Sequence, residues 1–248
     1  MGQASSAPII KDLNKDGKKE IISLSDYDIT VFDSQGNNLP GWPKKINEKD
    51  FKFYHEFYPS PPSIGDLNGD GKDEIFNSDL GGLYILDDKI ACGYAWNLDG
   101  TPANGWRNDC EDQKYEDWAV SHGGYISQFV IENSFIEDID NDGKGEIIFS
   151  ARITNQIIIS EGIYVLKGDG SIYSGWPIIL EGNQSEGIFR DISSPVAGDL
   201  DGDGNEEIVI GVIKSFNHCF APPQYCVRKE TSEIFIYSVN GQLIKNFL

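Results

Sequence analysis

A nine-residue pattern of oxygen-bearing side chains occurs four times in the chain. It reads DLNKDGKKE at 12–20, DLNGDGKDE at 66–74, DIDNDGKGE at 138–146 and DLDGDGNEE at 199–207. Each copy has Asp at position one, Asp or Asn at three, Asp at five, Gly at six and Glu at nine. Alternate residues of a curled loop can point their oxygens at one centre, and Gly permits the sharp turn. The spacing therefore predicts a loop that binds a hard cation.

Calcium is the cation that this ligand set fits best. Ca²⁺ accepts oxygen ligands at about 2.3–2.6 Å in tolerant geometry, whereas Mg²⁺ prefers a strict octahedron and Zn²⁺ prefers the His and Cys that these loops lack. The alternative is a set of Asx turns without metal, but the ligand positions of each loop would then hold three or four mutually repelling carboxylates. We expect about four calcium ions, one per repeat. The expected ligands, with a main-chain carbonyl at position seven, are Asp12, Asn14, Asp16, Lys18 and Glu20; Asp66, Asn68, Asp70, Lys72 and Glu74; Asp138, Asp140, Asp142, Lys144 and Glu146; and Asp199, Asp201, Asp203, Asn205 and Glu207.

These loops do not have the pattern of an EF-hand. An EF-hand requires a bidentate Glu at position twelve and flanking helices. Position twelve is here Ser23, Asn77, Phe149 or Ile210. The residues after each Glu read IIS, IFNS, IIFS and IVIG, short β-branched runs that indicate a strand.

A second pattern accompanies each loop and predicts the fold. An apolar segment, a Gly-bearing turn and usually Gly-Trp occur at 31–43, 95–107, 165–177 and 236–247. Each unit then reads strand, acidic loop, strand, variable connection, strand, Gly turn, strand, which is the four-stranded antiparallel blade of a β-propeller. We expect an all-β chain with a single β-propeller region over 1–248, and four blades at about 6–43, 60–107, 132–177 and 193–248. Trp42, Trp106 and Trp176 are expected in the core between blades.

The acidic loops resemble the FG-GAP/VCBS repeats of integrin α-subunits, of bacterial and archaeal surface proteins and of some fungal lectins. The resemblance runs from Ser6 to Phe247; SPVAGDL at 194–200 comes closest to the motif that names the family. It implies structural calcium at the residues named above and a propeller that is extracellular or at the cell surface. Propellers of this family commonly have more blades than the four repeats found here. An excised part of a larger propeller, a compact four-bladed ring, and an open arc that assembles with further blades or a second copy all remain open.

The long insertions define a second face of the expected blades. They cover 44–60, 78–93, 107–133, 151–162, 178–192 and 214–232, and antiparallel order places them opposite the acidic loops. Binding residues usually lie on loops of a rigid scaffold, so we expect this face to bind a protein or carbohydrate ligand. Two of the insertions combine aromatic and acidic residues, which suits such a ligand but would also serve to cover the blades. The candidates are Tyr54, His55, Tyr58, Tyr115, Trp118, His122 and Tyr125.

The four cysteines also lie in these insertions. Cys92 precedes the third strand of the second unit and Cys110 follows its fourth strand, so the two ends of one hairpin would bring them together. Cys219 and Cys226 lie in one connection and could pair locally. We expect two disulfides; the alternatives are free thiols or a four-cysteine zinc site, which lacks the usual CxxC spacing.

Composition excludes some classes of function. The net charge of −20 argues against nucleic-acid binding, and no apolar run approaches the roughly 20 residues of a membrane span. The three His residues are scattered without the spacing of a catalytic triad or zinc site, so we expect no enzyme activity. The function indicated is a calcium-stabilised recognition or adhesion module. The alternatives are an accessory or substrate-holding domain of a secreted polysaccharide-degrading enzyme, and a structural spacer.

Overall fold

The structure is a computed structural model of the 248-residue chain. It describes residues 6–25, 28–45, 61–77, 84–86, 89–92, 94–103, 105–106, 128–154, 159–181, 188–220 and 225–247. Every helix or strand within these ranges is a β-strand, so the predicted all-β class is confirmed for the part described. The described residues include no helix long and apolar enough to cross a membrane.

Four antiparallel sheets follow one another along the chain. The first contains β1 (Ile9–Lys11), β2 (Glu20–Leu24), β3 (Asp28–Phe32) and β4 (Lys44–Lys45). The second contains β5 (Ser63–Gly65), β6 (Glu74–Asn77) and β9 (Tyr94–Trp96), with β7 (Tyr84–Leu86) and β8 (Lys89–Cys92) forming a separate hairpin. The third contains β10 (Gln128–Glu137), β11 (Glu146–Thr154), β12 (Ile159–Leu166) and β13 (Ile178–Glu181). The fourth contains β14 (Ile188–Ile192), β15 (Val196–Gly198), β16 (Glu207–Phe220), β17 (Tyr225–Tyr237) and β18 (Leu243–Phe247).

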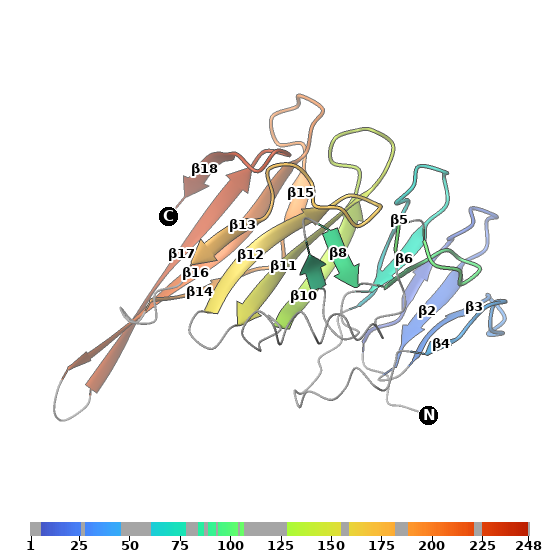
Figure 1. The fold of residues 1–248 in the computed structure, drawn as a ribbon, viewed down its shortest axis with the longest axis horizontal. Coiled ribbons are helices and arrows are strands. Elements are labelled where there is room, and N and C mark those ends of the chain that lie inside the picture. The colour runs from blue at the N-terminus through green and yellow to red at the C-terminus, as the bar shows by residue number, and fades with distance from the viewer. Residues whose placement is uncertain are drawn as a thin grey trace.

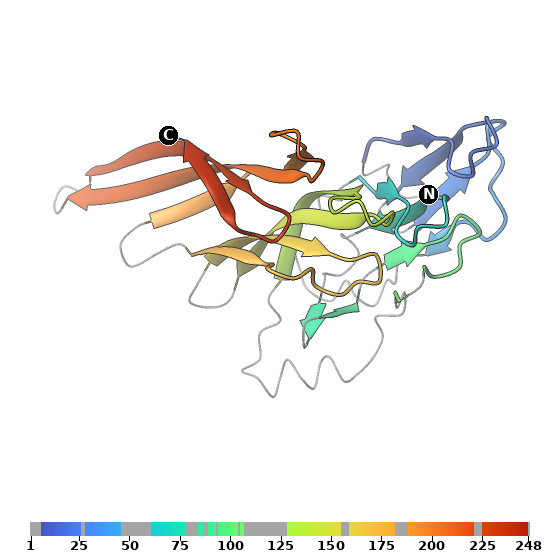
Figure 2. The same cartoon turned by 90° about the horizontal axis from the view of Figure 1, so that it is seen from above.

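The sheets are arranged side by side in an open arc (Figure 1). The first sheet lies at one end and the fourth at the other, and the view from above shows the same order (Figure 2). Apolar clusters join the first sheet to the second, the second to the third and the third to the fourth. The described strands thus form a series of packed sheets and not a closed ring.

Each sheet has two distinct faces, because side chains alternate along a strand. We call the face toward the next sheet in the chain the following face, and the opposite one the preceding face. In the third sheet, Ile148 and Val165 are cross-strand partners on the following face and pack in one cluster with Ile208 of the fourth sheet. Ile147 and Leu166 are partners on the preceding face and pack with the second sheet. This two-sided burial explains why the strands after the acidic loops are apolar at successive positions.

The strands of the third and fourth sheets extend into three of the predicted insertions. Most of 151–162 belongs to β11 and β12, most of 214–232 to β16 and β17, and both ends of 178–192 to β13 and β14. The expectation of loops was wrong for these residues. Ladder pairing continues from Val212↔Glu233 out to Phe220↔Tyr225, because β16 and β17 remain extended and in register. The fourth sheet also gains β14 as an additional strand against β16.

Three tryptophans join consecutive sheets, which confirms their predicted core position. Trp42, Trp106 and Trp176 are only 7%, 7% and 6% exposed. Each indole N–H donates to a backbone carbonyl in the Gly turn of the next sheet, namely that of Leu98 at 2.7 Å, Gly168 at 2.8 Å and Val239 at 2.8 Å. A buried aromatic ring with a satisfied N–H combines a large apolar area with a fixed orientation. The Gly-Trp element is therefore a joint between sheets.

The glycine of this joint allows a close backbone approach, which gives a testable prediction. Gly175 has a φ of +94°, and a Cβ there would lie 2.1 Å from the carbonyl oxygen of Asn240 in the next sheet. Gly36 has a similar φ of +86°, but a Cβ there would meet nothing within 4 Å. Gly36→Ala should lower the free energy of unfolding only by the strain of a left-handed Ala, about 1–2 kcal/mol. Gly175→Ala should lower the free energy of unfolding substantially more, because the neighbouring turn must move to make room for the methyl group. Equal shifts of the melting temperature in the two variants would show that the close approach of Gly175 to the next turn does not contribute to stability.

Candidate metal centres in the four acidic loops

The four acidic loops share one pattern of backbone hydrogen bonds to their side chains. The Gly N–H at position six donates to the Asp carboxylate at position one, at 2.9, 2.7, 2.9 and 3.0 Å in loops one to four. The N–H at position five donates to the side-chain oxygen at position three. The N–H at position seven donates to the Asp at position five. These bonds curl the backbone around the side chains, so the oxygens of positions one, three and five are gathered on the inside of each loop.

The Glu at position nine comes from the strand that follows each loop and is buried in all four copies. Glu20, Glu74, Glu146 and Glu207 are 4%, 2%, 2% and 6% exposed. Each accepts a hydrogen bond from the backbone N–H at position two, at 2.9, 2.8, 3.2 and 2.9 Å. A carboxylate accepts several hydrogen bonds or ligand contacts, so one N–H leaves capacity for a cation. The buried Glu therefore holds the start of each loop through the position-two N–H. Its spacing predicted a metal ligand but not this hydrogen bond.

The carboxylates of loops three and four converge to distances that suit calcium. One oxygen each of Asp138, Asp140 and Glu146 lies within 4.8 Å of the others, and the same holds for Asp199, Asp201 and Asp203. Oxygens bound to one Ca²⁺ at about 2.3–2.6 Å can be at most about 5 Å apart. Loops one and two have Asn at position three, so an amide oxygen replaces one carboxylate there. The residues present therefore fit a hard cation with oxygen ligands.

Burial raises the pKa of two of these glutamates. The pKa of Glu74 is raised to about 7, mainly by desolvation and in smaller part by the nearby carboxylates of Asp70 and Asp66. Desolvation likewise raises the pKa of Glu146 to about 8, with Asp140 and Asp142 adding to the effect. In both cases the hydrogen bond from the position-two N–H opposes the shift. A bound cation would favour the ionised form, so protons and cations should compete for these loops.

This competition predicts how stability depends on pH in calcium-depleted protein. Unfolding returns both glutamates to an ordinary pKa of 4.5, so the folded chain binds more protons between about pH 4.5 and 8. The stabilisation is complete below this window and is lost as pH rises through it. The melting temperature should be higher at pH 5.5 than at pH 8. Glu146→Gln should reduce the difference, whereas Glu233→Gln, outside the loops, should not. A melting temperature that rises between pH 5.5 and 8 would contradict the prediction.

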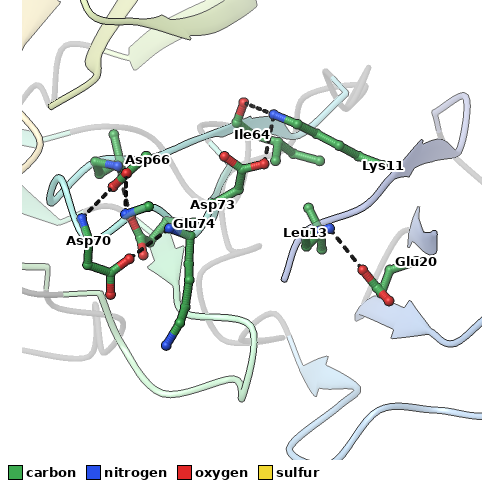
Figure 3. A network of polar contacts seen from close by, with 11 residues as sticks. Lys11, Leu13, Glu20, Ile64, Asp66, Asp70, Asp73 and Glu74 are labelled. Carbon is green, nitrogen blue, oxygen red and sulfur yellow. Dashed lines mark hydrogen bonds and ion pairs between the residues drawn. The ribbon is translucent and has the colours of Figure 1, made fainter. Parts of the chain in front are cut away.

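Adjacent acidic loops are also bonded to one another. The N–H at position eight of a loop donates to a carbonyl at position one or two of the preceding loop: Asp73 to Leu13 at 3.4 Å, Gly145 to Asp66 at 2.6 Å and Glu206 to Ile139 at 3.3 Å. Between the first and second loops, the Lys11 ammonium also lies 2.9 Å from the Asp73 carboxylate (Figure 3). The loops thus form a continuous row along one side of the sheets. Each loop from the second onward is therefore bonded directly to the loop before it.

Tyr173 is a loop contact that the sequence did not reveal. Its hydroxyl donates to the Asp140 carboxylate at 2.7 Å from the turn that follows β12. Burial raises the pKa of Tyr173 well above its ordinary value, and the bond to Asp140 raises it further. The corresponding turn of the first unit has Leu39 in place of Tyr173, so no repeated pattern marks this contact. Sequence spacing alone offered no signal for it.

Several predicted site residues lie outside the described ranges. These are Tyr54, His55, Tyr58, Tyr115, Trp118, His122, Tyr125 and Cys110. Cys92 is the last residue of β8, but Cys110 lies outside the described ranges. The proposed pairing of the two therefore stays a prediction. Cys219 and Cys226 are direct partners in the β16–β17 ladder, which is the backbone placement that a local disulfide needs. The disulfide itself also stays a prediction.

The repeated loop geometry is matched by a family comparison. A model of the FG-GAP-like repeat matches residues 12–76 and 138–210. The chain belongs to the FG-GAP-like repeat family. The two matched segments contain all four acidic loops, and the predicted family is thereby confirmed. Repeats of this family indicate a ligand-binding module in the general sense. No curated protein and no solved structure matches the chain.

Proposed function

We propose that the chain is a calcium-stabilised recognition module of the extracellular space, built as a β-propeller or as part of one. The observation that carries the proposal is the fourfold recurrence of one loop geometry, with its side-chain oxygens gathered inside and a buried Glu beneath. Four loops with this arrangement concentrate negative charge that a divalent cation would neutralise. Calcium near millimolar concentration outside cells is sufficient for loops of moderate affinity.

Calcium would act on the structure and not on a reaction. Each loop joins two consecutive strands, namely β1–β2, β5–β6, β10–β11 and β15–β16, and in loops two to four the position-eight N–H bonds to the preceding loop. An ion held by positions one, three, five, seven and nine would fix the hairpin and, through these bonds, the spacing of neighbouring sheets. The loops then serve as supports, and we place recognition of a protein or carbohydrate on the opposite face. A module of this kind needs a rigid scaffold, because ordered loops bind with a smaller entropic cost.

A calcium titration tests the proposal directly. Chelator-treated and dialysed protein should bind about four Ca²⁺ by isothermal titration calorimetry, and equal Mg²⁺ should compete poorly. Asp203→Ala should remove one site, because Asp203 belongs to a converging carboxylate group and accepts the Asn205 N–H at 2.7 Å.

Asp33→Ala provides the matched control for the titration. Asp33 is partly exposed and also accepts two backbone N–H bonds, at 2.9 Å from Gln35 and 2.8 Å from Asn37, but it lies outside the acidic loops. This variant should keep the full stoichiometry. Absence of calcium binding in the unmodified chain would refute the proposal. Equal stoichiometry in the Asp203 variant would refute the assignment of the fourth loop.

A further inference from the structure

The contact between consecutive sheets follows one rule throughout the described chain. The following face of a sheet is covered by the preceding face of the next. In the third sheet, Ile148, Ile163 and Val165 on the following face are 0% exposed. The acidic loops obey the same rule at position two, where Leu13, Leu67 and Ile139 are 0%, 2% and 0% exposed and pack in the clusters that join their sheet to the next.

The fourth sheet has the same apolar following face without a cover. Ile234 corresponds to Ile163 by its place before the Gly turn, yet it is 48% exposed. Leu200, at position two of the fourth loop, is 58% exposed, in contrast to its three buried equivalents. Val196 pairs with Val209 on the same face and is 60% exposed. A row of cross-strand apolar side chains is thus open to solvent at this end of the arc.

The preceding face of the first sheet is likewise apolar and has no sheet packed against it. Ile10, Ile21 and Phe32 are successive cross-strand partners there, and Ile10 is 60% exposed. The equivalent row in the second sheet contains Ile75 and Trp96, which are 0% and 3% exposed because the first sheet covers them. The two uncovered faces therefore correspond to the two sides of the contact that occurs three times inside the chain.

We propose that two copies of this chain associate head to tail, with the preceding face of the first sheet of one copy packed on the following face of the fourth sheet of the other. The inference extends an interface that the chain already repeats, and it does not depend on the proposed calcium binding. The uncovered faces lie at opposite ends of the arc (Figure 1), so within this structure they cannot cover each other. A second copy supplies the matching face with the same chemistry.

This contact should be weaker than the internal ones, because the Gly-Trp joint is missing from the fourth sheet. In the third sheet Ile163 pairs with Ile178, fifteen residues on, whereas in the fourth Ile234 pairs with Phe247, thirteen residues on. The outer strand β18 therefore starts without the Gly-Trp turn, and no indole reaches across. Association then relies on the apolar rows alone, which suits a reversible complex.

Sedimentation velocity in saturating calcium tests the proposal with three charge substitutions. The unmodified chain at up to about 100 µM should be a dimer or larger. Ile10→Glu and Ile234→Glu each destroy one of the two faces, and each variant alone should be a monomer with at least tenfold weaker association. Mixed in equal amounts, they should form a dimer and nothing larger, because one intact pair of faces remains. Ile179→Glu is the control, since Ile179 is 38% exposed and lies in β13 of the third sheet, outside both uncovered faces.

The alternatives give different outcomes. A monomeric unmodified chain would overturn the proposal. Loss of association in Ile234→Glu with no effect of Ile10→Glu would also overturn it, because it would show two fourth sheets packed on each other. Val196→Glu repeats the test if Ile234→Glu fails to fold. Circular dichroism and melting curves of each variant establish that association, and not folding, has changed.

Discussion

Removal of calcium should lower the melting temperature of this chain by roughly 20 °C or more, and renewed addition should restore it. An ion present at 100 times its dissociation constant stabilises the folded state by about 2.7 kcal/mol per site. For a chain of this size, each kcal/mol shifts the melting temperature by about 2–4 °C. Four loops of common geometry, each holding a buried Glu and inward-facing oxygens, would add their contributions.

Differential scanning fluorimetry with excess chelator, then with excess Ca²⁺ or Mg²⁺, measures this effect. Asp142→Ala, in a loop where three carboxylates converge, should reduce the calcium-dependent part of the shift. Asp33→Ala should leave it intact. An unchanged melting curve in excess chelator would mean that the loops are Asx turns whose backbone bonds suffice without an ion.

Replacement of Trp106 by Ala should destabilise the chain by about 3–5 kcal/mol. Trp106 is 7% exposed, its ring packs against Phe76 with centroids 5.3 Å apart, and its indole N–H donates to the Gly168 carbonyl at 2.8 Å. Ala removes the ring and leaves a cavity between the second and third sheets, together with an unsatisfied buried carbonyl. Urea unfolding followed by far-UV circular dichroism measures the loss.

Trp106→Phe separates the two contributions of this side chain. Phe keeps most of the apolar area but cannot donate to the Gly168 carbonyl, so the cost should be about 1–3 kcal/mol. Trp96→Phe is a useful comparison, because Trp96 is also buried in an intersheet cluster. If Trp106→Ala cost no more than an exposed substitution, the Gly-Trp element would not be a joint between sheets.

Much of the fold could be predicted because local chemistry repeats. The acidic loops identify turns whose Asp and Gly positions each have a physical reason, and the β-branched residues after each Glu identify strands. Long strands were harder to predict. The run from Lys214 to Phe220 reads KSFNHCF, which does not alternate strictly between apolar and polar residues, and it lies far from any motif. The sequence therefore predicts an insertion there, although the run belongs to β16. Only its pairing with β17 shows that the ladder continues.

The contacts between units could not be predicted from one sequence. The bond from Gly145 N–H to the Asp66 carbonyl joins backbone groups, and any residue other than Pro could make it. Tyr173 reaches Asp140 only because the turn after β12 folds over the third loop. The raised pKa of Glu146 likewise arises from burial against neighbouring sheets, which the spacing of its loop does not report. These features belong to tertiary packing, whereas the ligand pattern belongs to the loop alone.

The identity of the acceptor in each tryptophan joint has a consequence for how such proteins can change over evolution. The indole bonds to a main-chain carbonyl, and the receiving turns read NLDG, KGDG and SVNG. The first turn, DSQG, has the same closing hydrogen bond from its Gly. The receiving side therefore constrains backbone shape and a final Gly, but little else. A unit could be duplicated, deleted or exchanged without matched substitutions in its neighbour, so the number of units is free to vary while the joint stays the same.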